Sequence, residues 1–287
     1  MKVCVACNQV FEGAEWRCPV CGWGPEMRGG HPVFAPDAAE ESDGFHGSFF
    51  EALVEVERGH FWFESRNALI VWALRAWFPR AASLLEIGTG TGFVLEAIRR
   101  ARPALALCGS DIYQAALPVA GRRLPGVPLM QLDARRLPFE AEFDVLGAFD
   151  VLEHIEEYPA VLRQMFRACR PGGGILLTVP QHRFLWSAQD EYACHKRRFS
   201  RGELVREVRR AGFSVLRTTS FVSLPFPLLL FSRLRKGRRA DFDPFSEVRL
   251  PRAVNACLGG VLALERVGIA AGLSLPFGGS LLLAARR

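Results

Sequence analysis

The sequence predicts an α/β domain built on a doubly wound, mostly parallel, seven-stranded sheet, with a small metal-binding module in front of it. Two observations predict this fold class. Short apolar runs that favour strands alternate with helix-length segments over most of the chain, and four cysteines cluster at its N-terminal end. Strands that alternate with helices are typical of a parallel sheet covered by helices on both faces.

The length and composition allow one sizeable hydrophobic core and a small addition. The chain has 287 residues, of which 49% are hydrophobic and 23% are charged, so we expect one large domain and one small module. Its first residues lack the basic flank and the continuous apolar run of a secretory signal. The apolar run near Val261 is broken by Glu265 and Arg266, so we expect no transmembrane helix and a cytoplasmic protein.

The cysteines predict a zinc ribbon over residues 1–25. The expected ligands are Cys4, Cys7, Cys18 and Cys21. Their spacing is C-x2-C-x10-C-x2-C, in which each pair forms a tight turn that directs two thiolates at one point. Four thiolates make a closed tetrahedral site, which suits structural Zn(II), leaves no position for a substrate and supplies most of the folding free energy of so short a segment. A redox or disulfide pair and rubredoxin-like iron are the alternatives.

The segment after the cysteines predicts a linker, and the main domain follows it. Residues 26–45 are rich in Gly, Pro and acidic residues, a composition typical of loops. We therefore expect a tethered ribbon in front of a domain over residues 46–287. Apolar residues recur at helical spacing over residues 49–78, with Gly59 and Pro79 as breakers, which predicts two helices before the first strand of the sheet.

Seven apolar runs predict the strands of the sheet. They cover residues 83–87, 106–109, 127–131, 143–148, 174–179, 213–220 and 280–285. An insertion of about residues 222–276 separates the last two and combines an apolar stretch at 224–231, a basic cluster from Arg233 to Arg239 and an apolar helix over 254–273. This combination suits a lid over an apolar substrate or contact with an anionic membrane surface. Helices packed on the sheet edge with a solvated basic loop are the alternative.

A glycine-rich turn follows the first predicted strand. Residues 86–92 have the sequence Glu-Ile-Gly-Thr-Gly-Thr-Gly. Glycines at alternate positions let the backbone turn sharply and approach a ligand closely, at the carboxyl edge where doubly wound sheets bind ligands. A dinucleotide fingerprint, G-x-G-x-x-G, would need glycine where Phe93 stands. The turn therefore predicts a cofactor other than NAD.

The same turn resembles the first motif of class I S-adenosylmethionine-dependent methyltransferases of types 11 and 12, which is acidic-x-G-x-G-x-G. The resemblance implies a Rossmann-like methyltransferase fold and S-adenosylmethionine as the cofactor. In that family the glycine loop wraps the methionine part of the cofactor, and the acidic residue supports its amino group. The cofactor-binding residues that we predict are Glu86, Gly88, Thr89, Gly90, Gly92, Asp111, Ile112, Asp133, Ala134 and Asp150.

Three aspartates at predicted strand ends account for the remaining cofactor contacts. Asp111 follows the second strand, where a carboxylate can accept hydrogen bonds from both ribose hydroxyls. Asp133 lies in a segment that resembles the one whose Asp accepts from the adenine amino group in the family. Asp150 precedes Leu-Glu-His at 152–154, which resembles the family's fourth-strand signature and implies a place in the pocket wall. Asp111 or Asp133 alone is also typical of a helix cap or a turn.

The segment after the fifth strand predicts contacts to the substrate. It resembles one branch of the class I family, which carries a Trp…Asp…His-x-Arg-Arg-aromatic stretch at this place. The substrate candidates are Trp186, Asp190, Arg197 and Arg198, and the candidates for a catalytic base are His154 and His195. Imidazole titrates near neutral pH and can remove the proton of a hydroxyl acceptor. The alternatives are an Asp–Arg–His network that pins a loop, and histidines with structural hydrogen bonds.

These observations predict methyl transfer to a small-molecule or lipid-linked acceptor, by an in-line displacement in which the protein mainly aligns the reactants. The alternative is an rRNA or tRNA methyltransferase that uses the ribbon for RNA contact, which the net charge of +6 favours. The ribbon lacks a dense basic and aromatic face, however, and the [DN]-P-P-[YF] motif of enzymes that methylate nucleobase amines is absent. A third interpretation, a non-enzymatic protein whose ribbon recruits a protein partner, disagrees with the intact glycine loop.

Overall fold

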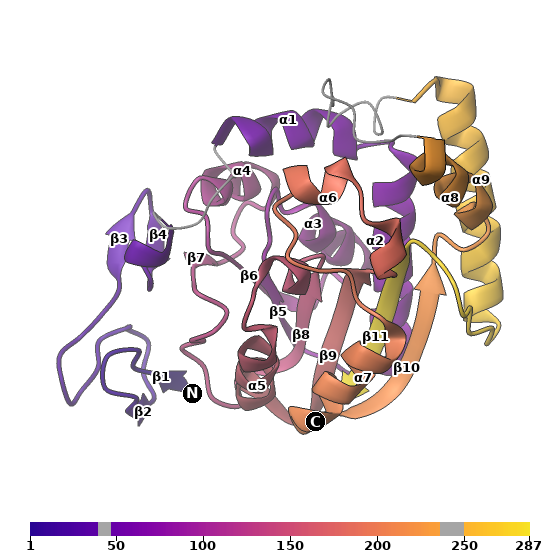
Figure 1. Ribbon diagram of the computed structural model, residues 1–287. Coiled ribbons are helices and arrows are strands. Elements are labelled where there is room, and N and C mark those ends of the chain that lie inside the picture. Colours follow the sequence, from indigo (N-terminus) through magenta and orange to yellow (C-terminus); the bar gives the residue numbers. More distant parts are fainter. Residues whose placement is uncertain (40–46, 236–249) are drawn as a thin grey trace.

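The computed structural model describes residues 1–39, 47–235 and 250–287 and has a twisted central sheet between layers of helices (Figure 1). Within the described residues the sheet has nine strands in the order β10-β11-β9-β8-β5-β6-β7-β4-β3. The strands are β3 (Glu26–Arg28), β4 (His31–Val33), β5 (Ser83–Ile87), β6 (Ala106–Asp111), β7 (Leu129–Gln131), β8 (Phe143–Phe149), β9 (Cys169–Pro180), β10 (Ser214–Phe221) and β11 (Ser280–Arg286), and a separate small sheet holds β1 (Lys2–Val3) and β2 (Val10–Phe11). The pairs among β5 to β9 are parallel, and β11 is antiparallel to β9 and β10. The predicted α/β class and all seven predicted strands are confirmed.

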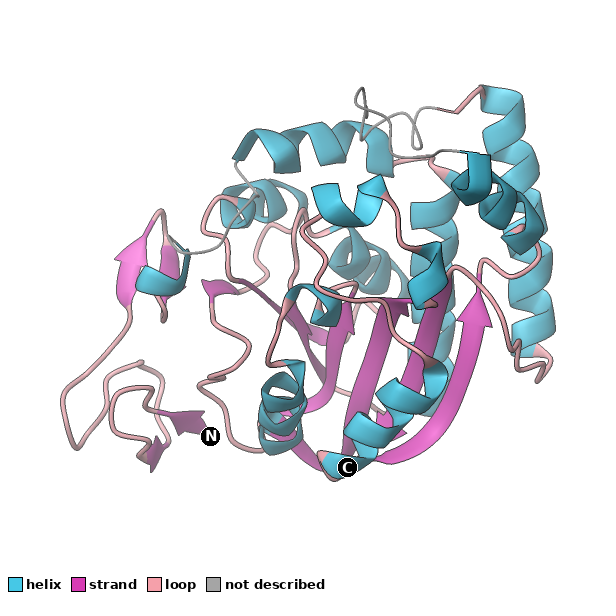
Figure 2. Ribbon diagram, in the orientation of Figure 1, coloured by secondary structure: helices cyan, strands magenta, loops and turns pink. Residues whose placement is uncertain are grey.

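Helices cover both faces of the sheet, and α1 and α6 lie at the end to which the parallel strands point (Figure 2). One face carries α2, α3 and α4, and the other carries α5 and α7. The helices are α1 (Gly47–Glu57), α2 (Phe61–Trp77), α3 (Phe93–Ala101), α4 (Ala116–Arg123), α5 (Tyr158–Ala168), α6 (Ala188–Tyr192), α7 (Arg201–Arg210), α8 (Phe226–Arg235) and α9 (Arg252–Ala270), with 3-10 helices η1 (Asp37–Ala39), η2 (Leu152–His154) and η3 (Arg183–Leu185). The two helices predicted over residues 49–78 are α1 and α2.

Alternate side chains of the central strands enter two separate hydrophobic cores. In β5, Leu84 belongs to the core under α2 and α3, whereas Leu85 belongs to the core under α5, and both are fully buried. A parallel strand that is buried on both faces needs a continuous apolar run, which is why its sequence could be recognised. The neighbours of β5 are β6 and β8, which continue the sheet in opposite directions. The crevice for a ligand therefore opens at the carboxyl end of β5.

A hairpin over residues 26–33 corrects the prediction of a linker over residues 26–45. It consists of β3 and β4, and its turn is Gly29-Gly30, with φ of 56° and 82°. The glycines that suggested a flexible segment instead supply the positive φ of a tight turn. Residues 40–46, the end of the predicted linker, lie outside the described part of the chain.

The side chain of Gln131 attaches this hairpin to the edge of the main sheet. Val33 pairs with Gln131 in parallel. The Gln131 amide also binds the backbone of Ala35 twice, since Oε1 accepts from the N–H at 2.9 Å and Nε2 donates to the C=O at 2.7 Å. Gln131 is fully buried, so these bonds satisfy an amide that would be costly to bury alone.

The cysteine segment packs on the domain, which corrects the expectation of a tethered ribbon. The Val3 N–H donates to the C=O of Pro138 at 2.9 Å. The Trp16 ring makes edge contacts with Phe34 and Phe139, at centroid distances of 4.7 and 5.6 Å. Aromatic pairs of this geometry stabilise an interface beyond the area that they bury. The ribbon lies beside the β7 end of the sheet (Figure 1).

The described residues of the insertion form the helices α8 and α9 at the β10 side of the molecule (Figure 1). Leu262 and Ile269 of α9 join the core that contains α2. Asn255 ties the same helix to the start of α2, because its Oδ1 accepts from the Phe61 N–H at 2.9 Å and its Nδ2 donates to the Gly59 C=O at 2.8 Å. The predicted apolar helix is thus anchored on the domain.

Helix α9 is long and apolar enough to cross a membrane by length and composition, and 17% of that stretch is buried. Glu265 and Arg266 lie within this helix and do not interrupt it, and the expectation of no transmembrane helix stays a prediction. Length and composition alone do not separate a spanning helix from one that packs on a domain. In the predicted basic cluster, the side chains of Arg233 and Arg235 and all of residues 236–249 lie outside the described part of the chain.

Candidate functional site

Two equivalent backbone turns bring the four cysteines together. The Asn8 N–H donates to the Cys4 C=O at 2.8 Å, and the Gly22 N–H donates to the Cys18 C=O at 3.0 Å. Asn8 and Gly22 both have positive φ, of 61° and 73°. Asn and Gly are the residues that adopt this conformation most readily, so each half of the cysteine pattern encodes its own turn.

The sulfur atoms have the spacing of a tetrahedral metal site. Cys4 Sγ lies 3.6 Å from Cys21 Sγ, and Cys7 Sγ lies 3.6 Å from Cys18 Sγ. All four sulfurs lie within 4.8 Å of one another. Sulfurs bound to one zinc ion at about 2.3 Å are about 3.8 Å apart at the tetrahedral angle. The residues therefore fit Zn(II), with four thiolates to complete its coordination.

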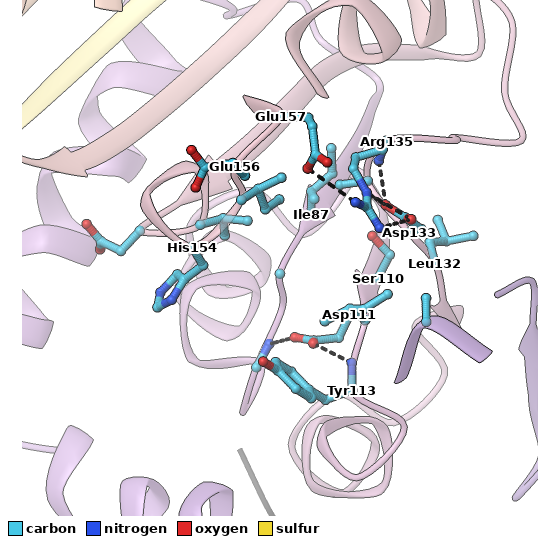
Figure 3. A pocket seen from close by; sticks show the side chains of 18 of the residues that line it. Ile87, Ser110, Asp111, Tyr113, Leu132, Asp133, Arg135, His154, Glu156 and Glu157 are labelled. Atoms are coloured by element: carbon cyan, nitrogen blue, oxygen red, sulfur yellow. Dashed lines mark hydrogen bonds and ion pairs between the residues drawn. The ribbon is translucent and has the colours of Figure 1, made fainter. Parts of the chain in front are cut away.

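A cavity of about 440 Å³ lies where the parallel strands end, and Figure 3 shows side chains from its wall. The predicted residues in its wall are Gly88, Gly90, Asp111, Ile112, Asp133, Ala134, Asp150 and His154. Glu86, Thr89 and Gly92 do not line it. The cavity brings together the ends of β5, β6 and β8 and the loop after β7, which is the arrangement expected at the switch point of a doubly wound sheet.

The glycine loop needs glycine for two different reasons. At Gly88, with φ of 71°, a Cβ would lie 2.4 Å from Val151 Cγ2, and at Gly92, with φ of 79°, a Cβ would lie 2.7 Å from Leu124 Cδ1. Both positions combine close packing with a left-handed backbone. Gly90 has φ of 53°, but a Cβ there would meet no atom within 4 Å. Its glycine therefore keeps open the space next to the cavity.

Asp111 connects the glycine loop to the end of β6. Its Oδ2 accepts from the Gly90 N–H at 2.7 Å, and its Oδ1 accepts from the Tyr113 N–H at 3.0 Å (Figure 3). Burial raises the pKa of Asp111 to about 6, against the lowering effect of these backbone hydrogen bonds. Two carboxylate oxygens offer about four acceptor positions, so Asp111 can still accept from the hydroxyls of a ribose.

Glu86 is a buried carboxyl with an unused oxygen. It is 1% exposed, and its Oε2 has no hydrogen-bond partner among the described residues. Burial raises the pKa of Glu86 well above its ordinary value, and Arg66 acts in the opposite direction. A buried acceptor of this kind is costly unless a donor reaches it. The amino group of S-adenosylmethionine, directly or through water, is a donor of the required type.

Asp133 lies in the wall but is held by an arginine that the sequence did not single out. Arg135 Nε and Nη2 donate to both Asp133 oxygens at 3.0 to 3.1 and 2.9 Å, and Arg135 Nη1 lies 3.2 Å from Glu157 Oε2 (Figure 3). The hydrogen bonds that Arg135 donates to Asp133 raise the pKa of Arg135. The bidentate pair fixes the orientation of the carboxylate, and an adenine amino group would have to share it.

Asp150 is likewise paired with a residue that sequence reasoning missed. Arg66 of α2 donates from Nη1 to Asp150 Oδ2 at 2.6 Å, and its guanidinium carbon lies 4.8 Å from the centre of the Trp62 ring. Asp150 has φ of 58°, a conformation that Asp tolerates better than most residues. No local pattern marks Arg66, because its partner follows a strand that is distant in the sequence.

A buried network surrounds Asp190, one of the predicted substrate contacts. Arg198 donates to both Asp190 oxygens, from Nε at 2.7 Å and from Nη2 at 3.0 Å, and His195 Nδ1 lies 2.8 Å from Asp190 Oδ1. Burial raises the pKa of Asp190, but the hydrogen bonds from His195 and Arg198 outweigh it and lower this pKa to about 2. These contacts form the Asp–Arg–His network that holds a loop in place, which the sequence analysis gave as the alternative to substrate contact.

None of the four substrate candidates lines the cavity, and this includes Trp186 and Arg197. Arg197 Nη1 donates to the C=O groups of Ile155 and Glu156 at 3.2 and 3.0 Å, and its guanidinium carbon lies 4.8 Å from the centre of the Tyr158 ring. Trp186 is 38% exposed. Arg197 thus supports the backbone of the wall, and its direct contact with a substrate stays a prediction.

The two candidate bases lie together at one end of the cavity. The ring centres of His154 and His195 are 4.8 Å apart at an interplanar angle of 77°. His154 lines the cavity, whereas His195 does not. Burial and the neighbouring His195 lower the pKa of His154 to about 3, so His154 is neutral at physiological pH. A base this weak is poorly matched to proton removal near pH 7.

Comparison with known proteins decides the family. A family model described as "Methyltransferase domain" matches residues 56–218. The chain belongs to this methyltransferase family. The match covers β5 to β9 with the glycine loop and all three aspartates, so the predicted family, the Rossmann-like fold and the S-adenosylmethionine cofactor of the family are confirmed.

One relative of this chain is named by its cofactor, and another is named by its substrate. It is 28% identical over 159 residues to a Mycolicibacterium smegmatis protein named as a probable S-adenosylmethionine-dependent methyltransferase, covering 54% of this chain and 60% of that one. It is 30% identical over 145 residues to a dTDP-4-amino-2,3,4,6-tetradeoxy-D-glucose N,N-dimethyltransferase of Saccharopolyspora spinosa, covering 49% and 53%. The chain thus spans little more than half the length of these relatives.

A solved structure supports the fold of the chain. The Haemonchus contortus phosphoethanolamine N-methyltransferase 2 in complex with S-adenosyl-L-methionine superposes with a TM-score of 0.56 at 19% identity, covering 88% of this chain and 60% of that one. The superposition supports the fold, and at this low sequence identity it does not indicate the methyl acceptor.

Proposed function

We propose that the protein transfers a methyl group from S-adenosylmethionine to a small-molecule or lipid-linked acceptor. The observation that carries this proposal is the cavity at the end of β5, where Gly88 and Gly90 lie in one wall with Asp111. Glycines let a cofactor approach the backbone closely, and a buried carboxylate can hold the hydroxyls of a ribose. The family match supports the reaction type, and the acceptor is our proposal.

Three polar parts of the cofactor have matching groups in this chain. The unpartnered oxygen of Glu86 suits the amino group, Asp111 suits the ribose hydroxyls and Asp133 suits the adenine amino group. When bound, S-adenosylmethionine supplies an electrophilic methyl carbon for in-line attack. The chain's own residues fix the direction of approach and exclude water, so their main contribution is alignment.

The wall of the cavity supports an acceptor with an apolar part. Figure 3 shows His154 well away from Asp133 and Arg135, so the cavity extends beyond the adenine side. Phe49 and Phe50 of α1 also line it. An apolar wall with a few polar groups is typical of sites for small molecules.

Exposed apolar side chains on the insertion support an acceptor held at a membrane. They are Leu224, Leu228, Val254, Leu264, Val267 and Leu273. Leu264 and Val267 of α9 are 68% and 64% exposed and lie three positions apart, so they share one face of the helix. Exposed apolar surface of this kind marks contact with a partner or with a membrane interface. We therefore include peripheral membrane contact through residues 222–276 in the proposal.

The alternative, an RNA methyltransferase, receives less support from the ribbon. Lys2 donates to the C=O groups of Gly13 and Ala14 at 2.6 and 2.7 Å and lies over the Trp16 ring. Its ammonium group is therefore used within the ribbon. A surface that binds phosphates needs cations that are free to reach them, so we rank RNA below a small or lipid-linked acceptor.

Calorimetric titration with S-adenosylhomocysteine tests the cofactor part of the proposal. We expect the wild type to bind one equivalent and Asp111→Asn to bind at least about tenfold more weakly, because the amide offers fewer acceptors to the ribose. Gly90→Arg should abolish binding by filling the space beside the loop. Glu12→Gln, a change on the exposed surface of the ribbon, is the matched control. Absence of wild-type binding would refute the proposal.

Labelled methyl transfer separates the two classes of acceptor. Wild-type protein is incubated with labelled S-adenosylmethionine and either a lipid extract or total RNA, and Gly90→Arg serves as the inactive control. Label in the lipid fraction supports the proposal, whereas label in RNA supports the alternative.

Vesicle sedimentation tests the membrane contact independently. We expect the wild type to sediment with anionic phosphatidylglycerol vesicles and the double variant Leu264→Ser/Val267→Ser to remain in the supernatant, because it loses the exposed apolar face of α9. Val20→Ser is the control, since Val20 is 69% exposed on the ribbon. Equal sedimentation of both variants would remove α9 from the proposal.

A further inference from the structure

A second cluster of potential ligands lies beside the cofactor cavity. Glu153 and His154 come from η2, after β8, and His195 comes from the loop after α6. One carboxylate oxygen and one ring nitrogen from each histidine lie within 4.8 Å of one another. Two imidazoles and a carboxylate are a common set of three protein ligands for zinc and related ions, and they leave further positions open.

Glu153 is the first sign that the cluster lacks a component. It is fully buried, and neither of its carboxylate oxygens has a hydrogen-bond partner among the described residues. Arg198 directs its guanidinium to Asp190 and to the Gln181 C=O instead. A buried carboxylate without donors is costly and is normally paired with a cation or coordinated to a metal.

His195 faces Glu153 with a nitrogen that has no proton to offer in the neutral ring. Asp190 holds His195 Nδ1 at 2.8 Å, and because an ionised carboxylate only accepts, Nδ1 must carry the hydrogen. The remaining nitrogen, Nε2, lies 4.0 Å from Glu153 Oε1, which is too far for a hydrogen bond. His195 Nε2 and the Glu153 carboxyl thus face each other across a gap that no hydrogen bond closes.

We infer that Glu153, His154 and His195 bind a divalent first-row transition-metal ion. Two ligand atoms on one metal at about 2.1 Å lie about 3.4 Å apart at the tetrahedral angle. The 4.0 Å between Glu153 Oε1 and His195 Nε2 has to shorten by about 0.6 Å, and the widest pair in the cluster, within 4.8 Å, by up to about 1.4 Å. Asp190 completes the arrangement, since a carboxylate on the far nitrogen of a ligating histidine fixes its tautomer and raises its basicity.

The place of this site suggests its use, in a step that rests on the proposed function. His154 is shared between the cluster and the cavity wall, so an open metal position can face an acceptor hydroxyl there. Coordination lowers the pKa of that hydroxyl, and its proton leaves to solvent. The oxygen then forms the bond to the methyl carbon while the bond between that carbon and sulfur breaks. The electron pair of the broken bond stays on sulfur.

The competing explanation is a protonated Glu153 with no metal. Burial raises the pKa of Glu153 well above its ordinary value, and Asp150 raises it further. The two explanations predict opposite results for Glu153→Gln, because glutamine resembles a neutral glutamic acid in shape but is a poor metal ligand.

Titration with Mn(II), followed by the loss of the free-ion electron paramagnetic resonance signal, tests the metal site in the full chain. The protein is first given one equivalent of zinc per chain, which the four thiolates of the ribbon take up, so that the added Mn(II) meets an empty second site. We expect one Mn(II) per chain in the wild type and at least tenfold weaker binding in Glu153→Gln and His195→Ala. Glu191→Gln, an exposed acid beside Asp190 on α6, is the control and should bind like the wild type.

Two further measurements keep the result decisive. Electron spin echo spectra of Mn(II) bound to the wild type should show modulation by imidazole nitrogen, and its absence overturns the site without any variant. S-adenosylhomocysteine calorimetry on the same samples reports the fold and the cofactor pocket. Cofactor binding without Mn(II), or Mn(II) binding that survives Glu153→Gln, refutes the metal site, whereas Mn(II) binding without cofactor binding refutes the proposed function alone.

Discussion

The cysteine site at the N-terminus and the carboxyl edge of the sheet gather polar side chains by opposite means. The C=O groups of Cys4 and Cys18 each accept a hydrogen bond from the N–H of the residue four positions later, which closes a turn. The cysteine site is therefore encoded locally. At the sheet edge, Asp150 meets Arg66, and His195 comes within 4.0 Å of Glu153, only because the whole domain is folded. The first site depends on its metal, and the second depends on the fold.

Removal of one zinc ligand should have the largest effect and should stay within the ribbon. We expect Cys18→Ser to lose bound zinc and to unfold residues 1–25, since structural zinc supplies on the order of 10 kcal/mol to such segments. The sheet edge should still bind S-adenosylhomocysteine. Atomic absorption and calorimetry measure the two quantities.

Cys257→Ser is the control for this change, because Cys257 is exposed and lies on α9. Loss of cofactor binding in Cys18→Ser would contradict the separation of the two regions. It would mean that the contacts of Trp16 with Phe34 and Phe139 transmit the damage to the loop after β7.

Neutralisation of Asp190 should have the next largest effect and should act on the domain. Asp190→Asn leaves the buried Arg198 without its carboxylate, and breaking a buried ion pair from one side costs about 3–5 kcal/mol. Urea unfolding followed by circular dichroism measures the change in the free energy of unfolding. Glu191→Gln, its exposed neighbour, should change it by less than about 0.5 kcal/mol. A small change in the free energy of unfolding for Asp190→Asn would show that contacts other than the Asp190 network stabilise the carboxyl edge of the sheet.

The contrast between local and distant contacts also explains which parts of the fold and of the site could be predicted from the sequence. The strands were predictable because a parallel strand buried on both faces must be apolar throughout, as 83–87 and 143–148 are. The glycine loop and the cysteines were predictable because each is a short pattern with one geometric purpose. Asp111 could be placed because it is the last residue of its strand, at the edge where such sheets bind ligands.

The remaining features depend on contacts between distant positions. Gly29-Gly30 has the composition of a linker, and only the pairing of Val33 with Gln131 makes it the turn of a sheet hairpin. Arg66 lies in an ordinary amphipathic helix, and nothing nearby marks it as the partner of Asp150. The full burial of Glu153 likewise appears only when η2 is packed under the loop that carries His195.

The pH dependence of stability should reveal the buried carboxyl of Asp111. Its folded pKa of about 6 exceeds its ordinary value of 3.8, so the folded state retains a proton that the unfolded chain has lost. Its contribution to stability is therefore complete below about pH 4 and disappears as the pH rises to about 6, a change of up to about 3 kcal/mol. Asp111→Asn should show a smaller decline over this interval in urea unfolding at fixed salt. Parallel curves for the two proteins would contradict the raised pKa.

The smallest effect should come from the glycine that borders the cavity, and it separates backbone strain from loss of ligand space. Gly90→Ala and Gly126→Ala both place a Cβ in open space on a left-handed backbone, with φ of 53° and 79°, so each should lower stability by about 1–2 kcal/mol. Of these two glycines, Gly90 lines the cavity and Gly126 does not. Calorimetry should therefore find S-adenosylhomocysteine binding weakened about tenfold in Gly90→Ala and unchanged in Gly126→Ala. Equal affinities would show that the glycine serves the turn alone and that the cofactor passes the loop at a greater distance.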